Sequence, residues 1–343
     1  MRTGVVGLGK MGLLHMGILN SLPDTKIVAI TETEKKILNY VKSSLPAINI
    51  YSDYNEMLNS ENLDLVYITT PIQTHVPIAI ACLEKNCNFF IEKPVSRNLN
   101  ETKQLYSKLK NTTIIHGVGY NRRFIDTFVK TKSLLEMNVL GDISAVTSSM
   151  YASNIFKKAS GWRSNKKLSG GGVLLDFGSH LIDLLLWYFG KILHVSGSHR
   201  SLYSTEVEDE AHMELYFKNG VHGTLDTSWS IKGYRLPEIS IEISGSNGSI
   251  KVTEDHIKIN LITPVAEFEN KETIIYKQSL NKGVPIDIAG QDYTKEDLHM
   301  VECIKNKQQS IINVFEASKA QSVIEAMYLA AKSNKREPVE YIE

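Results

Sequence analysis

The sequence predicts an α/β protein of two domains, a doubly wound parallel sheet followed by an α+β domain with a large, mainly antiparallel, open sheet. Two observations support this division. Residues 1–120 alternate short apolar runs with helical patterns, as repeated βαβ units do. Later residues show the period-two alternation of strands with one covered face. A chain of 343 residues is long enough for two such cores, and we place the domains at 1–120 and 121–343.

The expected strands of the first domain are short runs rich in β-branched and aromatic residues. They cover residues 3–9, 26–32, 64–71, 86–94 and 113–121. The expected helices run from the first strand to about Leu22, and over 75–86 and 100–111. Strands that alternate with helices in this way form a parallel sheet with helices on both faces.

The second domain changes from helical to strand-like patterns. A long helical run at 122–141 leads into "DISAVTSSMYAS", and an apolar helix is expected within 170–190. A hairpin is expected to turn at Asn219-Gly220, because Asn-Gly favours the tight turns that join antiparallel strands. In the next segment Ile239, Ile241 and Ile243 alternate with polar residues, and "SGSNGS" supplies the turn. A last amphipathic helix is expected over 315–334.

The composition is that of an ordinary globular protein, with 42 % apolar and 22 % charged residues. The formal net charge is zero, so the chain lacks the basic excess that nucleic acid or an anionic membrane surface requires. Gly, Lys and His interrupt the apolar N-terminal run, and we expect neither a signal peptide nor a transmembrane span.

Cysteines and histidines give no sign of a disulfide framework or of a metal site. Cys82, Cys87 and Cys303 form no C-x-x-C pair, so a reducing cytoplasm is the expected location. No metal is expected, because five further histidines show no metal-ligand spacing, namely His116, His194, His199, His212 and His222.

A glycine-rich loop follows the first strand and opens the first helix. It reads Gly7-x-Gly9-x-x-Gly12, with Lys10 and Met11 inside it. In a Rossmann domain the first glycine permits the tight turn, the second lets a pyrophosphate approach the backbone, and the third allows close helix–strand packing. The loop therefore predicts a dinucleotide site, although a plain tight turn can have the same pattern.

Glu32 ends the second strand, twenty residues after Gly12, where an acid binds the ribose hydroxyls of a dinucleotide. Its charge would repel a 2′-phosphate, which favours NAD over NADP. Lys35 and Lys36 lie just downstream and can relieve that repulsion, so NADP stays possible. The alternative for Glu32 is a solvated residue at a strand end.

Several motifs follow one another along the chain. They are the glycine loop, Thr70-Pro71 with His75, Glu92-Lys93-Pro94, "GYNRRF" at 119–124, and "GGGVLLDFGSHLID" at 170–183. In this order, and over nearly the whole chain, the sequence resembles the glucose–fructose oxidoreductase / inositol dehydrogenase / rhizopine catabolism family, written Gfo/Idh/MocA. Two departures are visible: Ile72-Gln73 where the family often has Asn, and Glu32 where Asp is commoner.

The resemblance implies a Rossmann domain, a C-terminal α/β domain and an NAD(P)-dependent oxidoreductase. The enzyme would transfer a hydride between the nicotinamide and a secondary alcohol of a sugar, an inositol-like polyol or a nucleotide sugar. It implies the catalytic residues Lys93, Asp176 and His180. It also implies cofactor contacts outside the glycine loop and Glu32, namely Thr70, Pro71, His75, Glu92, Lys93 and Asn121.

The residues of the apolar helix support the same chemistry. Asp176 and His180 are four residues apart and so share one helix face, and Asp183 lies roughly on that face as a structural residue or a partner that orients His180. Leu181, Ile182, Leu184 and Leu185 would seat the other sides in the domain. Histidine is the side chain best suited to accept a hydroxyl proton near neutral pH, and a charged Lys93 would stabilise the developing alkoxide. A buried structural His–Asp pair is the alternative.

Basic residues near these motifs are candidates for substrate binding. Tyr120 and Arg123 follow the last strand of the first domain, next to Arg122, which a solvated helix start explains equally well. Arg163 lies in the polar loop "SGWRSNKK", which can contact an acidic or phosphorylated sugar or can simply be solvated. With Lys93, Asp176 and His180, these residues complete the expected substrate set.

Two other functions stay open from sequence. A relative of the same fold can retain NAD during glycoside cleavage or epimerisation, or can act as a non-catalytic dinucleotide-sensing regulator. A homo-oligomer, dimer or tetramer, is expected from the resemblance and from the open second sheet. The sequence does not indicate which sugar or carbon reacts, or in which direction.

Overall fold

The computed structural model describes residues 1–44, 47–157 and 161–343. The chain divides into two compact units. The first unit comprises Met1–Asn121 and Gly283–Ser318, and the second comprises Arg122–Lys282 and Lys319–Glu343. The segment Gly283–Ser318 thus packs with the first unit, whereas we expected it in the second domain. Its residues contact elements far away in sequence, and no local pattern reveals such contacts.

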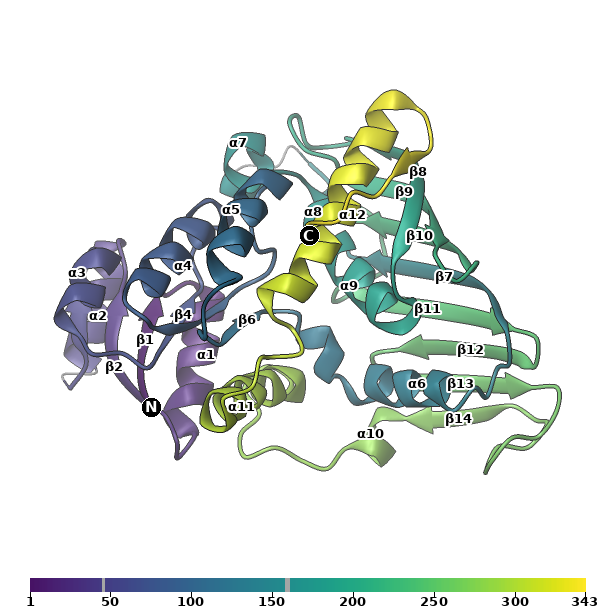
Figure 1. The fold of residues 1–343 in the computed structure, drawn as a ribbon, viewed down its shortest axis with the longest axis horizontal. Coiled ribbons are helices and arrows are strands. Elements are labelled where there is room, and N and C mark those ends of the chain that lie inside the picture. Colours follow the sequence, from purple (N-terminus) through teal and green to yellow (C-terminus); the bar gives the residue numbers. More distant parts are fainter. Residues whose placement is uncertain (45–46, 158–160) are drawn as a thin grey trace. The chain divides into compact units, whose positions relative to one another are not determined.

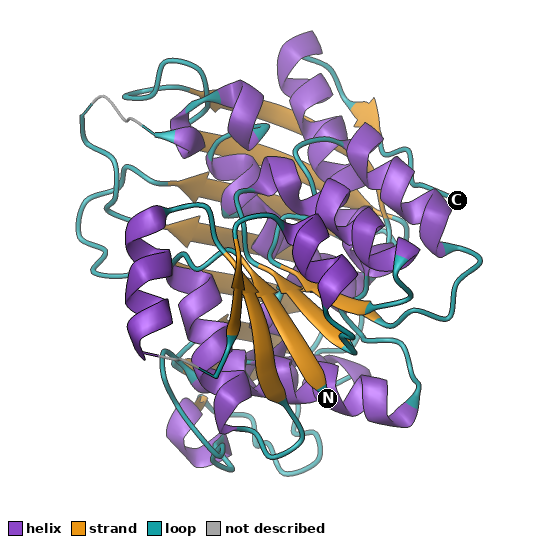
Figure 2. Ribbon diagram, turned by 90° about the vertical axis from the view of Figure 1, so that its left-hand side faces the viewer, coloured by secondary structure: helices purple, strands orange, loops and turns teal. Residues whose placement is uncertain are grey.

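The first unit contains a six-stranded parallel sheet among its described residues, with the order β3-β2-β1-β4-β5-β6. The strands run side by side in one direction (Figure 2). They are β1 (Arg2–Val6), β2 (Lys26–Thr31), β3 (Asn49–Tyr51), β4 (Leu65–Ile68), β5 (Asn88–Ile91) and β6 (His116–Val118). This is the Rossmann strand order, and it confirms the predicted doubly wound sheet. The short strand β3 was not predicted, since three residues give no periodic signal.

Helices follow the strands of the first unit in the expected alternation (Figure 1). They are α1 (Lys10–Ser21), α2 (Lys35–Ser44), α3 (Tyr54–Ser60), α4 (His75–Glu84), α5 (Leu99–Leu109) and α11 (Gln291–Asn306). Two of these helices have side-chain N-caps. The Asp53 side chain accepts two backbone N–H groups at the start of α3, and the Asn98 side chain accepts one at the start of α5. Helix α11 comes from the distant segment and packs against α1.

The second unit contains a nine-stranded sheet among its described residues, ordered β14-β13-β12-β11-β7-β10-β9-β8-β15. The strands are β7 (Ile143–Tyr151), β8 (Ile192–Arg200), β9 (Glu210–Phe217), β10 (His222–Ser228), β11 (Glu238–Gly245), β12 (Gly248–Thr253), β13 (His256–Leu261), β14 (Thr273–Tyr276) and β15 (Glu337–Pro338). Of the pairings within this sheet, β10 with β7 is parallel and the others are antiparallel, which confirms the mainly antiparallel sheet.

Helices cover one face of the second sheet. Helix α6 (Asp126–Glu136) lies along β12 and β13, and α9 (Gly178–Phe189) packs on β7 and β10 (Figure 1). The remaining helices are α7 (Lys166–Ser169), α8 (Val173–Asp176), α10 (Lys277–Leu280) and α12 (Val314–Ser333). Ile239, Ile241 and Ile243 are fully buried, as their alternation predicted. The hairpin turns at Asn219-Gly220, where Gly220 has φ +88°.

The apolar helix is bent, and this corrects our expectation of one continuous helix. It divides into α8 and α9 at Phe177, so Asp176 and His180 lie on two consecutive helices. The burial of the apolar side chains of this helix was predicted correctly. All four are 0 % exposed: Leu181, Ile182, Leu184 and Leu185.

No single helix in the described part of the chain is long and apolar enough to cross a membrane. One pair of helical segments reaches that length and composition together, with a bend of 48° between them. The two segments are Lys166–Asp176 and Gly178–Phe189. Most side chains of Gly178–Phe189 are buried within the protein, as those of a core helix are.

Candidate active site

The loops of the first unit that carry the predicted cofactor residues all follow carboxyl ends of neighbouring parallel strands. The glycine loop follows β1, and Glu32 follows β2. Thr70 follows β4, Lys93 follows β5, and Asn121 follows β6. In a doubly wound sheet this edge is where ligands bind, at the point where the strand order reverses, here between β1 and β4.

The glycine loop has the geometry that a dinucleotide requires. Gly7 has φ +91°, a conformation that favours glycine. A Cβ on Gly12 would lie 2.0 Å from the Gly7 carbonyl oxygen, so only glycine fits between helix and loop. A Cβ on Gly9 would meet nothing within 4 Å, which leaves the backbone open to a ligand. These observations match the three roles assigned from sequence.

The N-terminus of α1 is open to an anion. Gly9 is its N-cap and supplies no side-chain hydrogen bond to the first turn. The first N–H groups of a helix lack partners within the helix, and with the helix dipole they favour a phosphate. The residues present therefore fit the pyrophosphate of a dinucleotide.

The Glu32 carboxylate lies beside the glycine loop. Its Oε2 accepts the backbone N–H of Leu8 at 2.7 Å. Its Oε1 accepts the N–H groups of Thr33 at 2.6 Å and Glu34 at 2.9 Å. Three backbone donors hold the carboxylate at the end of β2, where the ribose of a dinucleotide is bound in this fold.

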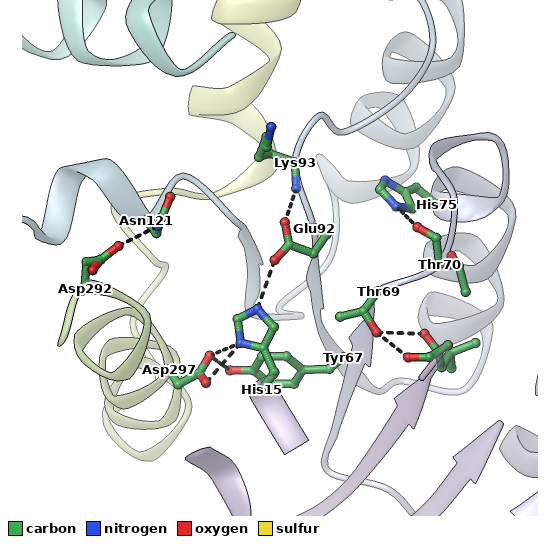
Figure 3. Close-up of polar contacts among 12 residues, drawn as sticks. His15, Tyr67, Thr69, Thr70, His75, Glu92, Lys93, Asn121, Asp292 and Asp297 are labelled. Atoms are coloured by element: carbon green, nitrogen blue, oxygen red, sulfur yellow. Dashed lines mark hydrogen bonds and ion pairs between the residues drawn. The ribbon is translucent and has the colours of Figure 1, made fainter. Parts of the chain in front are cut away.

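Two polar residues brace the loop after β4. The Thr69 hydroxyl lies 2.7 Å from the Gly7 carbonyl oxygen and 3.1 Å from that of Val6, so it ties this loop to the glycine loop. His75 is buried, and its Nε2 lies 2.8 Å from the Thr70 carbonyl oxygen (Figure 3). Its Nδ1 lies 2.9 Å from the Pro94 carbonyl oxygen. Burial lowers the pKa of His75, which favours the neutral ring. A neutral ring has a single N–H, which donates to one of these two carbonyl oxygens. The structure gives His75 a bracing position between two loops.

The turn Glu92-Lys93-Pro94 follows β5, and its Lys93–Pro94 peptide bond is cis. Glu92 Oε2 accepts the backbone N–H of Lys93 at 3.1 Å. A Cβ on Gly119 would lie 2.9 Å from the same oxygen, so glycine leaves room for the carboxylate. Lys93 is partly exposed, as a residue that contacts a ligand must be.

Behind this turn lies a buried cluster that our sequence analysis missed (Figure 3). His15 Nε2 is 3.0 Å from Glu92 Oε1, and His15 Nδ1 is 2.8 Å from Asp297 Oδ1. The Tyr67 hydroxyl donates to the same Asp297 oxygen at 2.9 Å. A buried histidine on the apolar face of the first helix was a usable sequence signal. Asp297 gave none, because it lies 282 residues away from His15.

Asn121 is buried at the end of β6. Its Nδ2 donates to Asp292 Oδ2 at 2.6 Å, and Asp292 lies in the first turn of α11 (Figure 3). The amide is thus held by a residue of the distant segment, and its orientation is fixed by that bond.

In the second unit, a buried carboxylate anchors the start of α8. Glu208 Oε1 accepts the backbone N–H groups of Gly172 at 2.8 Å and Leu174 at 3.0 Å, and the Tyr328 hydroxyl at 2.8 Å. A Cβ on Gly172 would lie 2.1 Å from the Glu208 carbonyl oxygen. Only glycine therefore fits at this position.

The candidate catalytic residues of this unit follow that anchored turn. Asp176 ends α8 and is partly exposed, while His180 lies in the first turn of α9 with 5 % of its surface exposed. The Ser179 hydroxyl donates to the Asp176 carbonyl oxygen at 3.0 Å, across the bend. Lys93 belongs to the first unit.

Three expected substrate residues have different surroundings. Arg123 is 5 % exposed and forms a two-fold hydrogen-bonded ion pair with Asp183, which holds both side chains in place. Tyr120 is 2 % exposed. Arg163 is exposed, with its guanidinium 4.5 Å from the centre of the Trp162 ring. The substrate contact expected of each of the three stays a prediction.

Comparisons with known proteins agree with this geometry. The model of an oxidoreductase family with an NAD-binding Rossmann fold matches residues 1–120, and that of the GFO/IDH/MocA C-terminal domain matches residues 128–251. The chain is 30 % identical to myo-inositol 2-dehydrogenase of Thermotoga maritima, over 73 % of this chain and 74 % of the relative. The chain belongs to the Gfo/Idh/MocA oxidoreductase family.

Two further relatives cover nearly all of this Gfo/Idh/MocA chain. The scyllo-inositol 2-dehydrogenase (NAD(+)) of Bacillus subtilis is 26 % identical over 92 % of this chain and 90 % of its own. A levoglucosan dehydrogenase solved in complex with NADH has the same fold, with a TM-score of 0.91, 21 % identity and full coverage of both chains. The N-terminal domain of the Gfo/Idh/MocA protein is thus an NAD-binding Rossmann domain, as the glycine loop predicted.

Among the residues that the structure describes, no three His, Cys, Asp or Glu side chains gather in a way that could hold a metal ion.

Proposed function

We propose that the protein is an NAD-dependent dehydrogenase that acts on a secondary alcohol of a sugar or polyol. Relatives named as inositol 2-dehydrogenases support this substrate class. The observation that carries the proposal is the position of Lys93 after β5, two strands away from the glycine loop after β1, at the ligand-binding edge of the Rossmann sheet.

The cofactor contacts follow from that edge. The α1 N-terminus, with Gly9, Lys10 and Met11, binds the pyrophosphate, and Glu32 binds the ribose hydroxyls. Three features border the nicotinamide side: the loop with Thr70 and Pro71, the Glu92-Lys93 turn, and Asn121. His75 braces the loop and the turn. When bound, NAD supplies the acceptor for the hydride of the alcohol carbon.

The remaining chemistry falls to three side chains of the chain itself. His180 accepts the hydroxyl proton as general base. The Lys93 ammonium hydrogen-bonds the same oxygen and stabilises its developing negative charge. Asp176 accepts a hydrogen bond from a neighbouring hydroxyl and orients the ring, and Arg163 lies at the substrate side. The products are a ketone, the reduced cofactor and one proton on His180.

A substrate screen tests the proposal directly. Purified protein is mixed with NAD⁺ or NADP⁺ and with myo-inositol, scyllo-inositol, levoglucosan, aldoses or UDP-sugars, and the NADH absorbance band is followed. We expect turnover with NAD⁺ and at least one cyclic polyol or sugar. A protein that binds NAD⁺ but reduces it with none of them favours a sensor. Conversion of sugar without net change in free cofactor favours a retained-NAD enzyme.

Two histidine variants test the assignment of the base. His180→Ala should lower kcat by about 10²–10⁴-fold, because a positioned general base contributes that much. NAD⁺ affinity should change little. The matched control is His194→Ala, on the exposed surface of β8, which should keep wild-type turnover. Near-full activity of His180→Ala would remove this residue from the mechanism.

We further expect a cytoplasmic homo-oligomer. The three cysteines are free and buried, in keeping with a reducing compartment. The open face of the second sheet is hollowed at β8, β9 and β10, between His212, Glu214 and Asp226, and offers a surface to a second copy. Light scattering of the purified protein measures the mass in solution, and a monomer would contradict this expectation.

A further inference from the structure

The ring of His15 lies between two carboxylates inside the first unit. Nε2 is 3.0 Å from Glu92 Oε1, and Nδ1 is 2.8 Å and 3.0 Å from the two oxygens of Asp297. The His15 side chain and that of Asp297 are both 0 % exposed. Water therefore cannot supply a missing hydrogen-bond partner to the ring.

This geometry fixes the number of protons in the cluster. A neutral imidazole has one N–H donor and one nitrogen that only accepts, and an ionised carboxylate only accepts. A neutral ring between two ionised carboxylates can therefore form only one of the two hydrogen bonds. Both form only when the three groups together hold one additional proton. Without that proton, a nitrogen lone pair would face a carboxylate oxygen in a dry interior, which is strongly unfavourable.

The surrounding donors place this proton on the ring. The Tyr67 hydroxyl donates to Asp297, and the Lys93 backbone N–H donates to Glu92, so each carboxylate already accepts a second hydrogen bond. Burial raises the pKa of Asp297, while His15 and the Tyr67 hydroxyl oppose that rise. Burial alone would lower the pKa of His15, but Asp297 and Glu92 outweigh it, and the pKa lies well above its ordinary value.

Aromatic and acidic groups also lie around the ring. Tyr293 of α11 meets the ring edge-on, and Phe90 of β5 lies at a tilt. Glu296 is fully buried on α11, and neither of its carboxylate oxygens has a hydrogen-bond partner among the described residues. Burial raises the pKa of Glu296 well above its ordinary value; the charge of His15 opposes this rise, and Glu92, Asp297 and Asp292 add to it. His15 therefore holds the positive charge of the cluster.

We propose that protonated His15 is a positioning residue for Lys93, acting through Glu92. Its Nε2–H fixes the Glu92 carboxylate, whose other oxygen receives the Lys93 backbone N–H and sets the turn that carries the lysine. Asp297 supplies the counter-charge that keeps the ring protonated, and so joins the segment Gly283–Ser318 to the active-site turn. The role of Lys93 in this inference rests on the proposed function.

The charge state of His15 is measured by ¹⁵N NMR on protein labelled at histidine. The chain has ten histidines, and the His15 signals are identified by their loss in His15→Phe or, should that variant not fold, in His15→Gln. We expect both ring nitrogens to carry protons from pH 6 to pH 9. In Asp297→Asn the titration midpoint should fall by about 1–3 units, as removal of a neighbouring opposite charge does. A neutral ring in the wild type at pH 7 overturns the inference.

Steady-state kinetics against pH test the link to Lys93. In His15→Phe two carboxylates face each other without a cation, so one takes up a proton and kcat acquires a new acid limb. At neutral pH we expect kcat to fall about 10- to 100-fold, in line with the loss from small displacements of a catalytic group. NAD⁺ affinity should stay within about twofold of the wild type, since no phosphate contact is touched. A loss confined to KM, or no new limb, contradicts a positioning role.

Two further variants separate positioning from general damage. His116→Phe removes another buried histidine of the same unit, whose Nδ1 accepts the Val314 N–H at 3.1 Å, and should leave the pH profile unchanged. His15→Phe with Asp297→Asn removes one of the two facing carboxylates and should recover part of kcat. A double variant no better than His15→Phe overturns the inference. If the wild type itself turns over no alcohol, the proposed function fails while the NMR titration still decides the charge of His15.

Discussion

The Arg123 guanidinium meets the Asp183 carboxylate in two parallel hydrogen bonds, Nε to Oδ2 at 2.8 Å and Nη2 to Oδ1 at 2.7 Å. Both side chains are almost completely buried, and Arg123 also lies 5.7 Å from the centre of the Trp187 ring. An arginine that pairs so closely with a buried carboxylate is fixed in place. The pair joins the start of the second unit to helix α9, which carries His180.

Asp183→Ala should destabilise the protein by about 3–5 kcal/mol, because it leaves a buried guanidinium without its counter-charge. Urea unfolding measures this loss. The control is Lys132→Ala, which breaks the exposed pair of Lys132 with Glu136 on α6 and should cost about 0.3–0.5 kcal/mol. Equal losses for the two variants would contradict the structural role of the buried pair.

Local patterns explain why most of the fold could be predicted. The glycine loop, the alternating isoleucines of β11 and the Asn219-Gly220 turn each depend on residues close in sequence, and each was found where expected. The break at Phe177 was missed, although the pair Gly178-Ser179, at which helices tend to kink, follows it directly.

The site was predicted only in part, for a related reason. Motifs along the chain indicated Lys93, Glu32 and the glycine loop, since each adjoins a predicted strand end. Asp297 and Asp292 could not be predicted, because both lie on helix α11, far along the chain. Asp297 is 282 residues after its partner His15, and Asp292 is 171 residues after its partner Asn121, so only tertiary packing brings them together. The pairing of Arg123 with Asp183 likewise appears only in three dimensions.

Glu32→Ala should weaken NAD⁺ binding by about 10- to 100-fold, because hydrogen bonds to a charged group contribute roughly 1.5–3 kcal/mol. NADP⁺ binding should weaken less or improve, since the charge that opposes a 2′-phosphate is gone and Lys35 and Lys36 remain nearby. Isothermal titration with both nucleotides gives the affinity ratio.

The matched control for this change is Glu34→Ala, which removes the same charge two residues away on an exposed side chain. It should leave the ratio of NAD⁺ to NADP⁺ affinity near the wild-type value. If Glu34→Ala shifts the ratio as much as Glu32→Ala, the preference comes from overall charge and not from the Glu32 carboxylate.

Glu296→Met should stabilise the protein by about 1–3 kcal/mol at pH 7–8, since it removes buried polar atoms that have no partner in the described structure. Burial raises the pKa of Glu296 in the folded state above its unfolded value. The pH-dependent part of the cost of burying this group is therefore absent below the unfolded pKa of about 4.3, and it grows as pH rises toward the folded pKa. The gain should be smaller at pH 4 than at pH 8.

Thermal unfolding at both pH values measures this difference. Glu302→Met is the control, because Glu302 is an exposed glutamate on the same helix α11, and it should change stability by less than about 0.5 kcal/mol at either pH. A Glu296→Met variant that is less stable than the wild type at pH 8 would show that the buried carboxyl has a favourable partner.

Gly119→Ala should lower kcat with little loss of stability. Its new Cβ would lie 2.9 Å from Glu92 Oε2 and 3.2 Å from the Lys93 backbone nitrogen, so the Glu92 carboxylate must move away from the bond that sets the turn. Gly117→Ala is the matched control two residues earlier, because its Cβ would lie 3.1 Å from the Met300 sulfur and 3.2 Å from the Phe90 ring, and no atom of Glu92 or Lys93 is among its three nearest neighbours. We expect Gly117→Ala to keep wild-type kcat, and we expect Gly119→Ala to lose about tenfold or more, as a displaced catalytic group does. Full activity in Gly119→Ala would mean that Lys93 works without the Glu92 contact, and the turn would then owe its geometry to Pro94 and the strands around it.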